Sequence, residues 1–124
     1  MKGVHLTQRE LDVMSVLWEL GEATAAEVRD RVDPDLAYTS ISTVIRLLET
    51  KKYVAHRKGE GKTHLYYPLI EASAAGKTAL GRVMEKIYGG SPVTLLANLI
   101  DQHRLTDKEL ARMRELLDTH KKRK

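Results

Sequence analysis

The sequence predicts a mainly α-helical protein with one small β-hairpin. Two observations support this fold class. Apolar residues recur at spacings of three and four along most of the 124 residues, and only residues 53–68 change to the composition and alternation of strands. The chain contains no cysteine and no phenylalanine, and 42% of its residues are hydrophobic. A core of Leu, Val, Ile, Ala and Met is therefore expected, as is typical of small helical domains.

Threonine and glutamate residues three positions apart predict the starts of the first two helices. These pairs are Thr7 with Glu10 and Thr24 with Glu27. The first helix is expected to end at Leu20-Gly21, and the second at about Val32, before Asp33-Pro34. The apolar line of the first helix consists of Leu11, Val13, Met14, Val16, Leu17 and Trp18. Leu6 and Leu11 are expected to form a hydrophobic staple across its start.

The third helix is expected over residues 38–51, with a buried stripe of Ile41, Val44, Ile45 and Leu48. Two strands follow at 53–58 and 63–68, and the glycines of the segment 59–62 suit a hairpin turn. Three short helices followed by a basic hairpin are the layout of a winged helix-turn-helix domain. Residues 1–70 are therefore predicted to bind DNA, with the third helix in a major groove and the hairpin along the phosphates.

Three more helices are expected in the rest of the chain. The first covers 71–88, the second begins at Ser91-Pro92, and the last begins at Thr106 with Glu109 as its capping partner. These helices carry more apolar residues than a winged domain of this size needs, so residues 71–120 are predicted to form a helical dimerisation region. The residues assigned to it are Leu80, Val83, Met84, Ile87, Val93, Leu95, Leu96, Leu99, Ile100, Leu110, Met113, Leu116 and Leu117. Residues 121–124 are predicted to be a basic disordered tail.

Charge distribution favours DNA as the partner. The net charge is +4, and residues 38–68 alone carry six Lys or Arg against two Glu, whereas residues 1–37 are acidic. Base or phosphate contacts are assigned to Tyr38, Thr39, Ser40, Ser42, Thr43, Arg46, Lys51, Lys52, Arg57, Lys58 and Lys62. The alternative for each is an ordinary solvated surface, and for Tyr38 it is packing against the second helix.

Catalysis and metal binding are not indicated. Without cysteine, disulfides, thiolate metal sites and thiol nucleophiles are excluded. The five histidines lack metal-ligand spacing, although His56 and His64 could face each other across the hairpin and supply two ligands at most. No serine has a His/Asp arrangement nearby in the sequence, and the segment 59–62 lacks the setting of a phosphate-binding loop. Neither enzymatic activity nor a cofactor or metal is therefore expected.

Membrane insertion is not indicated either. No apolar stretch approaches the roughly 18 residues of a membrane helix, and the first residues lack the apolar core of a signal peptide. A cytoplasmic protein is therefore expected.

Three motifs in order resemble the penicillinase-repressor family (BlaI/MecI/CopY) of bacterial transcription factors. They are Leu-Thr-x-x-Glu-Leu-x-Val-Met-x-Val-Leu-Trp-Glu at 6–19, Asp-Leu-Ala-Tyr-Thr-Ser at 35–40 and Gly-Gly-Ser-Pro at 89–92. The resemblance implies a homodimeric repressor on double-stranded DNA, at a palindromic operator that overlaps a promoter. For the β-lactam-responsive branch it also implies release by a membrane sensor protease. The cut would then fall at Asn98-Leu99. The copper-responsive branch is disfavoured because the chain lacks a cysteine-rich tail.

The chain departs from the family pattern at Lys52, where a glycine is usual after the third helix. A lysine in the left-handed conformation required there costs about 1 kcal/mol, and Lys52 is predicted to contact phosphate instead. The sequence is also compatible with two alternative functions. One is a winged-helix regulator released by a small ligand or metal, and the other is a winged-helix module that binds proteins.

Overall fold

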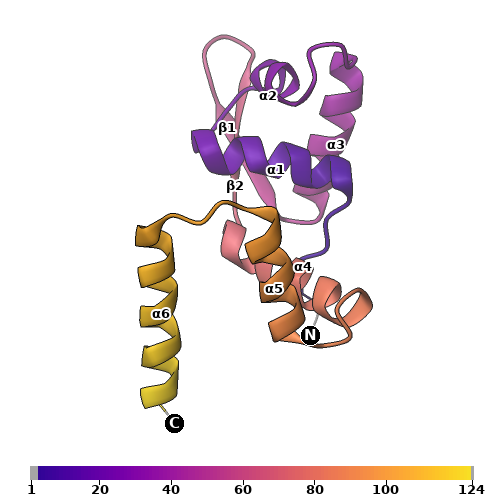
Figure 1. The fold of residues 1–124 in the computed structure, drawn as a ribbon. Coiled ribbons are helices and arrows are strands. Elements are labelled where there is room, and N and C mark those ends of the chain that lie inside the picture. Colours follow the sequence, from indigo (N-terminus) through magenta and orange to yellow (C-terminus); the bar gives the residue numbers. More distant parts are fainter. Residues whose placement is uncertain (1–2, 124) are drawn as a thin grey trace. The chain divides into compact units, whose positions relative to one another are not determined.

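The computed structural model describes residues 3–123 (Figure 1). Helices α1 (Gln8–Leu20), α2 (Ala25–Val32) and α3 (Tyr38–Thr50) precede a hairpin of β1 (Val54–Lys58) and β2 (His64–Pro68). Helices α4 (Ala72–Lys86), α5 (Pro92–Gln102) and α6 (Asp107–Lys122) follow. The predicted fold class is confirmed. Within the described residues, no helix is long and apolar enough to cross a membrane.

The capping signatures read from the sequence are present as hydrogen bonds. The hydroxyl of Thr7 accepts from the Glu10 amide at 3.2 Å, and the Glu10 carboxylate accepts from the Thr7 amide at 2.8 Å. Thr24 with Glu27 and Thr106 with Glu109 form the same reciprocal pairs. Gly21 ends α1 with a φ of 84°, a conformation that glycine adopts without the steric cost of a Cβ atom. The predicted helix starts are therefore correct.

The core of the winged unit lies between α1, α2, α3 and the hairpin. Its fully or nearly fully buried members are Val13, Met14, Val16, Leu17, Ala23, Ala25, Val28, Ile41, Ile45, Leu48 and Val54. Leu11, expected in the apolar line of α1, is instead 39% exposed, whereas Glu10 is 3% exposed. At 3.6 residues per turn, Glu10 lies one turn before Val13 and Met14 on the buried face, and Leu11 falls to its side. The expectation for Leu11 was therefore wrong.

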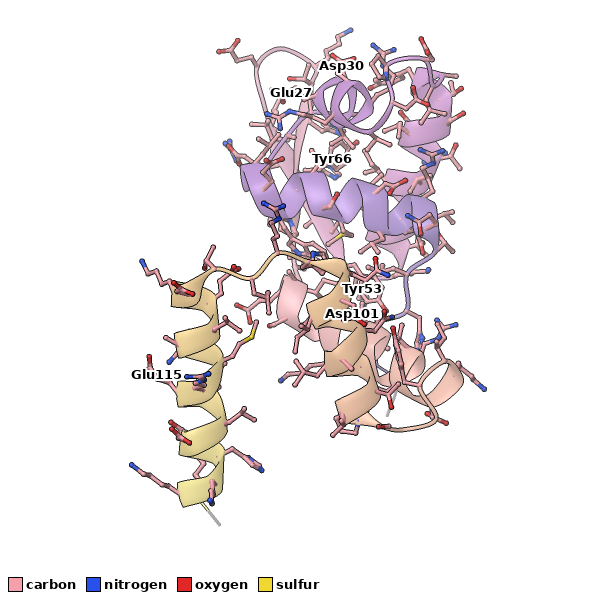
Figure 2. The ribbon with its side chains drawn as sticks, viewed as in Figure 1. Glu27, Asp30, Tyr53, Tyr66, Asp101 and Glu115 are labelled. Atoms are coloured by element: carbon pink, nitrogen blue, oxygen red, sulfur yellow. The ribbon has the colours of Figure 1, made fainter. Side chains whose placement is uncertain are left out.

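The two strands pair antiparallel, with His56 opposite Tyr66 and Lys58 opposite His64. Ala23, in the loop between α1 and α2, forms a bridge with Tyr66 through backbone hydrogen bonds of 3.0 and 2.8 Å. Tyr66, labelled in Figure 2, also packs its side chain against the core. The hairpin is therefore attached to the helices at its base, and its turn is left exposed.

The boundary between the two compact units falls between Gly81 and Arg82, inside α4, and not near residue 70 as expected from the sequence. Ala75 is 7% exposed, and the indole nitrogen of Trp18 donates to the Ile70 carbonyl at 2.9 Å. The beginning of α4 therefore belongs to the winged unit. The prediction of a disordered tail is wrong for Lys121 and Lys122, which form the end of α6, and Lys124 lies outside the described residues. Basic residues there interact favourably with the negative end of the helix dipole.

The second unit contains the end of α4, α5 and α6. Gly89 and Gly90, with φ values of 57° and 80°, make the turn between α4 and α5, and the Gly90 amide donates to the Met84 carbonyl at 2.7 Å. The Ser91 hydroxyl caps α5, followed by Pro92 at the first helical position, as expected. No described residue from Arg82 onward is buried.

Candidate nucleic-acid interface

Helix α3 has an apolar face in the core and a polar face in solvent. Ile41, Ile45 and Leu48 are at most 1% exposed. The residues on the opposite side of the helix are Thr39, Thr43, Arg46 and Thr50. All four are exposed, as is Ser40, whereas Ser42 is half-buried. The exposure predicted for Ser42 was therefore only partly correct.

Two residues of this face were not identified from the sequence. Thr50 lies seven residues after Thr43, so the helical period alone was sufficient to include it. Leu47, 51% exposed, flanks the same face. The hydroxyls of Thr43 and Thr50 donate to the carbonyls of Thr39 and Arg46, at 2.9 and 3.0 Å. These hydroxyls are thus held in place and keep their acceptor capacity for a ligand.

The start of α3 is open to anions. Its N-cap, Ala37, provides no side-chain hydrogen bond, and the first turn contains no acidic residue. The unpaired amides at a helix start and the positive end of its dipole favour a negatively charged group. Tyr38, at the first position, is 51% exposed. Its ring is accessible, so it remains a candidate contact.

Lys51, predicted to contact DNA, pairs with the buried carboxylate of Glu10. Its ammonium lies 2.8 and 2.9 Å from the two carboxylate oxygens, and its side chain is 40% exposed. Burial opposes the charge on Glu10, but hydrogen bonds from Lys51 and Thr7 outweigh it and hold the Glu10 pKa below its ordinary value. Lys51 thus has a structural role that was not identified from the sequence.

Lys52 has the left-handed conformation that was expected from its position, with a φ of 67°. It is exposed and is the middle residue of the short segment between α3 and β1. It is the only non-glycine residue with a positive φ among the residues that the structure describes. The backbone conformation expected for Lys52 is confirmed.

The β1–β2 hairpin, the wing of the fold, carries three cations that were predicted to contact DNA: Arg57, Lys58 and Lys62. Their surroundings differ. Arg57 binds Glu22, from the loop before α2, with two hydrogen bonds of 3.0 and 2.7 Å. This bond raises the pKa of Arg57 and lowers that of Glu22. Lys58 and Lys62 are exposed, and neither is in an ion pair with another described residue. They are the wing cations whose charge is uncompensated.

Strand alternation explains this difference. His56 and Lys58 share one face of β1, and Arg57 points to the other. On the first face, Nδ1 of His56 lies 2.5 Å from a carboxylate oxygen of Glu49 on α3. Arg57 instead reaches Glu22. The face of the hairpin that adjoins α3 therefore carries His56 and Lys58.

The rings of the two wing histidines stack, although the two residues are not direct partners across the hairpin: His56 lies opposite Tyr66, and His64 lies opposite Lys58. The ring centroids of His56 and His64 are 4.2 Å apart and the rings are nearly parallel, at 10°. Both rings contact Tyr66 edge-on. Burial, followed by the nearby Glu49 charge, raises the Tyr66 pKa, so its hydroxyl stays protonated. In the described part of the chain, no group of three or more metal-ligating side chains is arranged around a common point.

The apolar residues assigned to dimerisation lie largely in solvent. Exposed are Leu80, Ile87, Val93, Leu96, Leu99, Ile100, Leu110, Leu116 and Leu117, and half-buried are Val83, Met84, Leu95 and Met113. Glu115, labelled on α6 in Figure 2, forms a solvated pair with Arg112. Asn98 lies on α5, and its amide nitrogen donates to the Tyr88 hydroxyl at 2.6 Å. Asn98 and Leu99 are both exposed.

Comparison with known proteins supports a repressor. Residues 6–119 match the family model of the penicillinase repressor. The chain is 25% identical to the penicillinase repressor of Bacillus licheniformis over 122 residues, which are 97% of this chain and 94% of that protein. It is 25% identical to the methicillin resistance regulatory protein MecI of Staphylococcus aureus (strain N315) over 119 residues, 94% of this chain and 96% of that one.

A solved structure agrees with these sequence matches. The DNA-binding domain of the repressor BlaI covers 59% of this chain and 90% of its own, with a TM-score of 0.51 and 28% identity. The covered share of this chain corresponds in length to the winged unit, which contains α3 and the β1–β2 hairpin.

Proposed function

Since the chain belongs to the penicillinase repressor family, it is a DNA-binding transcriptional repressor and not an enzyme, and we propose that it acts as a homodimer on a palindromic operator. The observation that supports this most directly is the polar face of α3, opposite its buried stripe. Arg46 can donate two hydrogen bonds to a guanine edge, and Thr39 and Thr43 offer hydroxyls to bases. Lys58 and Lys62 supply phosphate contacts beside it.

Dimerisation is supported by the exposed apolar residues of the second unit. Helices α5 and α6 contain no buried residue in the single chain. Exposed leucines and isoleucines spread over these helices mark a surface for association. A second copy offers the same surface, and a two-fold axis would place two recognition helices on two half-sites of one DNA face.

We also propose that proteolysis between Asn98 and Leu99 releases the DNA, as the similarity to resistance regulators suggests, with a membrane sensor protease that responds to β-lactams as the partner. Both residues are exposed on α5. A protease needs an extended segment, and α5, with no buried residue, loses little packing when it unwinds. A cut there would separate part of the dimer surface from the winged unit and lower the affinity for paired half-sites.

Fluorescence anisotropy tests operator binding. A labelled duplex from upstream of the gene is compared with a scrambled duplex, using wild type, Arg46→Ala and the control Arg9→Ala. Arg9 is another helical arginine, paired with Asp12 on its own helix. We expect wild type and Arg9→Ala to prefer the native duplex by roughly 10³-fold, and Arg46→Ala to lose about 1–3 kcal/mol of that preference. Equal binding of both duplexes by wild type would contradict the operator proposal.

Intact-mass measurement tests the release. The repressor is recovered from cells grown with and without a β-lactam. A fragment that ends at Asn98, present only after exposure, is the expected result. A repressor that stays intact while its target gene is induced would contradict release by this cut and would favour a small ligand or metal as the signal.

A further inference from the structure

Basic and imidazole side chains line a hollow of about 500 Å³ on the wing. The lining residues are His56, Arg57, Lys58, Gly61, Lys62, Thr63 and His64. The lining contains no carboxylate, although Glu60 lies in the same turn. Since Arg57 is neutralised by Glu22, Lys58 and Lys62 provide the net positive charge of the hollow. Such a concave cationic surface suits a phosphate group.

A second hollow, of about 390 Å³, connects the wing with the helix-turn-helix. It is lined by Thr24, Ala25, Ala26, Tyr38, Lys62, Thr63, His64 and Tyr66. Lys62, Thr63 and His64 therefore line both hollows, and Tyr38 at the start of the recognition helix lines the second. A DNA strand that passes from the start of α3 to the wing would meet His64 on its way.

The ring of His64 is held in place without using its nitrogens. It stacks on His56, whose own Nδ1 is bonded to Glu49 on the recognition helix. No hydrogen bond joins the His64 ring to another described residue, and the side chain is exposed. Glu49 and His56 thus act as positioning residues, while the nitrogens of His64 stay available to an outside acceptor.

We propose that His64 is a DNA-backbone contact of this repressor and that phosphate binding at the wing takes up protons through the stacked pair of His56 and His64. The proposal depends on the DNA binding described above and adds pH as a variable. The operator affinity is set partly by the protonation of this pair. Neither histidine was assigned to DNA binding from the sequence.

The direction of the pH effect follows from charge. A neutral imidazole and an imidazolium can both donate a hydrogen bond to phosphate, but only the imidazolium adds the attraction of opposite charges, so DNA binding favours the protonated form. Affinity therefore rises as the pH falls through the range where imidazole generally titrates.

The surrounding charges act in both directions. Glu49, from α3, favours the charged pair, whereas Lys58 and Lys62, from the wing, oppose it. Tyr66, which both rings contact edge-on, stays uncharged because burial raises its pKa, and Tyr38 lines the second hollow with His64. The charge of Arg46, on α3, acts on Tyr66 and also opposes a positive charge beside it. Bound phosphate changes this balance because its negative charge favours protonation.

The test is the affinity for the native and scrambled duplexes at about pH 6 and about pH 8. It uses wild type, His64→Gln, His64→Lys and the control His5→Gln. His5 is an exposed histidine of the same unit, and its hydrogen bond to the Tyr53 hydroxyl uses only the backbone amide. Thermal unfolding by circular dichroism at both pH values verifies that each variant is folded.

We expect wild type and His5→Gln to bind about fivefold more tightly per protomer at the lower pH, or about 25-fold for a dimer. For His64→Gln, the ratio of the affinity at the lower pH to the affinity at the higher pH should fall close to one. His64→Lys should bind at the higher pH about as tightly as wild type does at the lower one, since its charge is permanent across this range. This rescue separates a phosphate contact from a structural effect of the substitution.

Two results would overturn the inference: a pH ratio of His64→Gln equal to that of wild type, or a folded His64→Lys that binds no better than His64→Gln at the higher pH. Equal binding of the two duplexes by wild type would instead contradict operator recognition. Because backbone contact is independent of sequence, the pH ratio on either duplex still decides the role of His64.

Discussion

Glu10 is a buried carboxylate that depends on a lysine from another helix. It is 3% exposed on the core face of α1, and Lys51, just after α3, donates to both of its oxygens. Glu10 also accepts from the Thr7 amide as part of the cap of α1. The pair therefore joins the start of the first helix to the end of the recognition helix, and its loss would affect the position of both.

Replacement of Lys51 by Met is expected to lower the free energy of unfolding by about 1–3 kcal/mol near neutral pH. The lower part of this range is expected because Lys51 is 40% exposed and its charge is screened by solvent. Urea unfolding followed by the fluorescence of Trp18, at fixed protein concentration, measures the change. Lys77→Met, at an exposed site on α4, is the control and should change it by less than about 0.5 kcal/mol.

The difference in the free energy of unfolding between wild type and Lys51→Met should depend on pH. The pKa of Glu10 is lower in the folded protein than its ordinary value of 4.5, so its stabilising contribution is complete above that value. The contribution is lost as the pH falls through the folded-state pKa. Wild type and Lys51→Met should therefore approach each other in stability at acidic pH. A difference that persists unchanged there would show that Lys51 stabilises the fold through its aliphatic chain and not through Glu10.

Lys52 leads to a second prediction at the residue scale. Its φ of 67° is unfavourable for a residue with a Cβ atom. Lys52→Gly is expected to raise the free energy of unfolding by about 1 kcal/mol, whereas Lys52→Ala, which removes the same charge but keeps Cβ, should leave it nearly unchanged. Urea unfolding compares the two. Equal stability of both variants would indicate that the backbone strain is absorbed elsewhere.

Single residues were predictable where the signal is local. The conformation of Lys52 was implied by the family resemblance, in which a glycine is usual at that place, and the Thr7–Glu10 cap followed from a spacing of three. The pairing of Lys51 with Glu10 spans 41 residues, and that of Arg57 with Glu22 spans 35. Such partners depend on how elements pack, which spacing along the chain does not contain. For this reason two of the predicted DNA contacts proved to be members of ion pairs.

The wing is an element with two chemically different faces. Arg57 pairs with Glu22 on one face, and Lys58 is unpaired on the other, beside His56. A phosphate must displace the Glu22 carboxylate before it can bind Arg57, whereas Lys58 and Lys62 exchange only water and counterions. The three cations should therefore contribute unequally to the salt dependence of DNA binding.

We expect Lys58→Ala and Lys62→Ala each to reduce the slope of log affinity against log salt by about 1 per protomer, and Arg57→Ala to reduce it by clearly less. Anisotropy titrations at several salt concentrations measure these slopes. Glu22→Gln is the complementary variant, since it frees Arg57 and should increase the slope. If Arg57→Ala reduces the slope as much as the lysine variants do, Arg57 leaves Glu22 when DNA binds.

Elements were more predictable than their grouping into units. The two strands of the hairpin and the helix starts follow from alternation, turn glycines and capping residues, and α3 ends within one residue of its expected end. The boundary at Gly81 did not follow, because α4 is one continuous helix and nothing in its sequence marks where its packing partners change. The length of α6 was underestimated because a basic run indicates a tail as readily as a favourable helix end.

At the scale of the whole molecule, the apolar surface is unevenly distributed. The winged unit has a closed core around Met14, Leu17 and Ile41, whereas the described residues after Gly81 are at most half-buried. Helices that bury so little surface gain little to offset the conformational entropy lost on ordering. The second unit is thus expected to owe its stability to association, and operator binding to depend on the same surface.

Leu96→Asp tests this dependence, with Leu11→Asp as the matched control. Both leucines are 39% exposed in the single chain, but Leu96 lies on α5 in the proposed dimer surface and Leu11 on α1 outside it. A charge buried at the interface without a partner should convert the dimer to monomer in sedimentation velocity. Affinity for the full palindrome should then fall by about 10²-fold or more, while affinity for a single half-site stays nearly the same, because only the linkage of two half-sites is lost.

Leu11→Asp should remain dimeric and bind as wild type does. A monomeric wild type, or a Leu96→Asp variant that remains dimeric with full affinity, would contradict the dimer surface proposed for α4, α5 and α6.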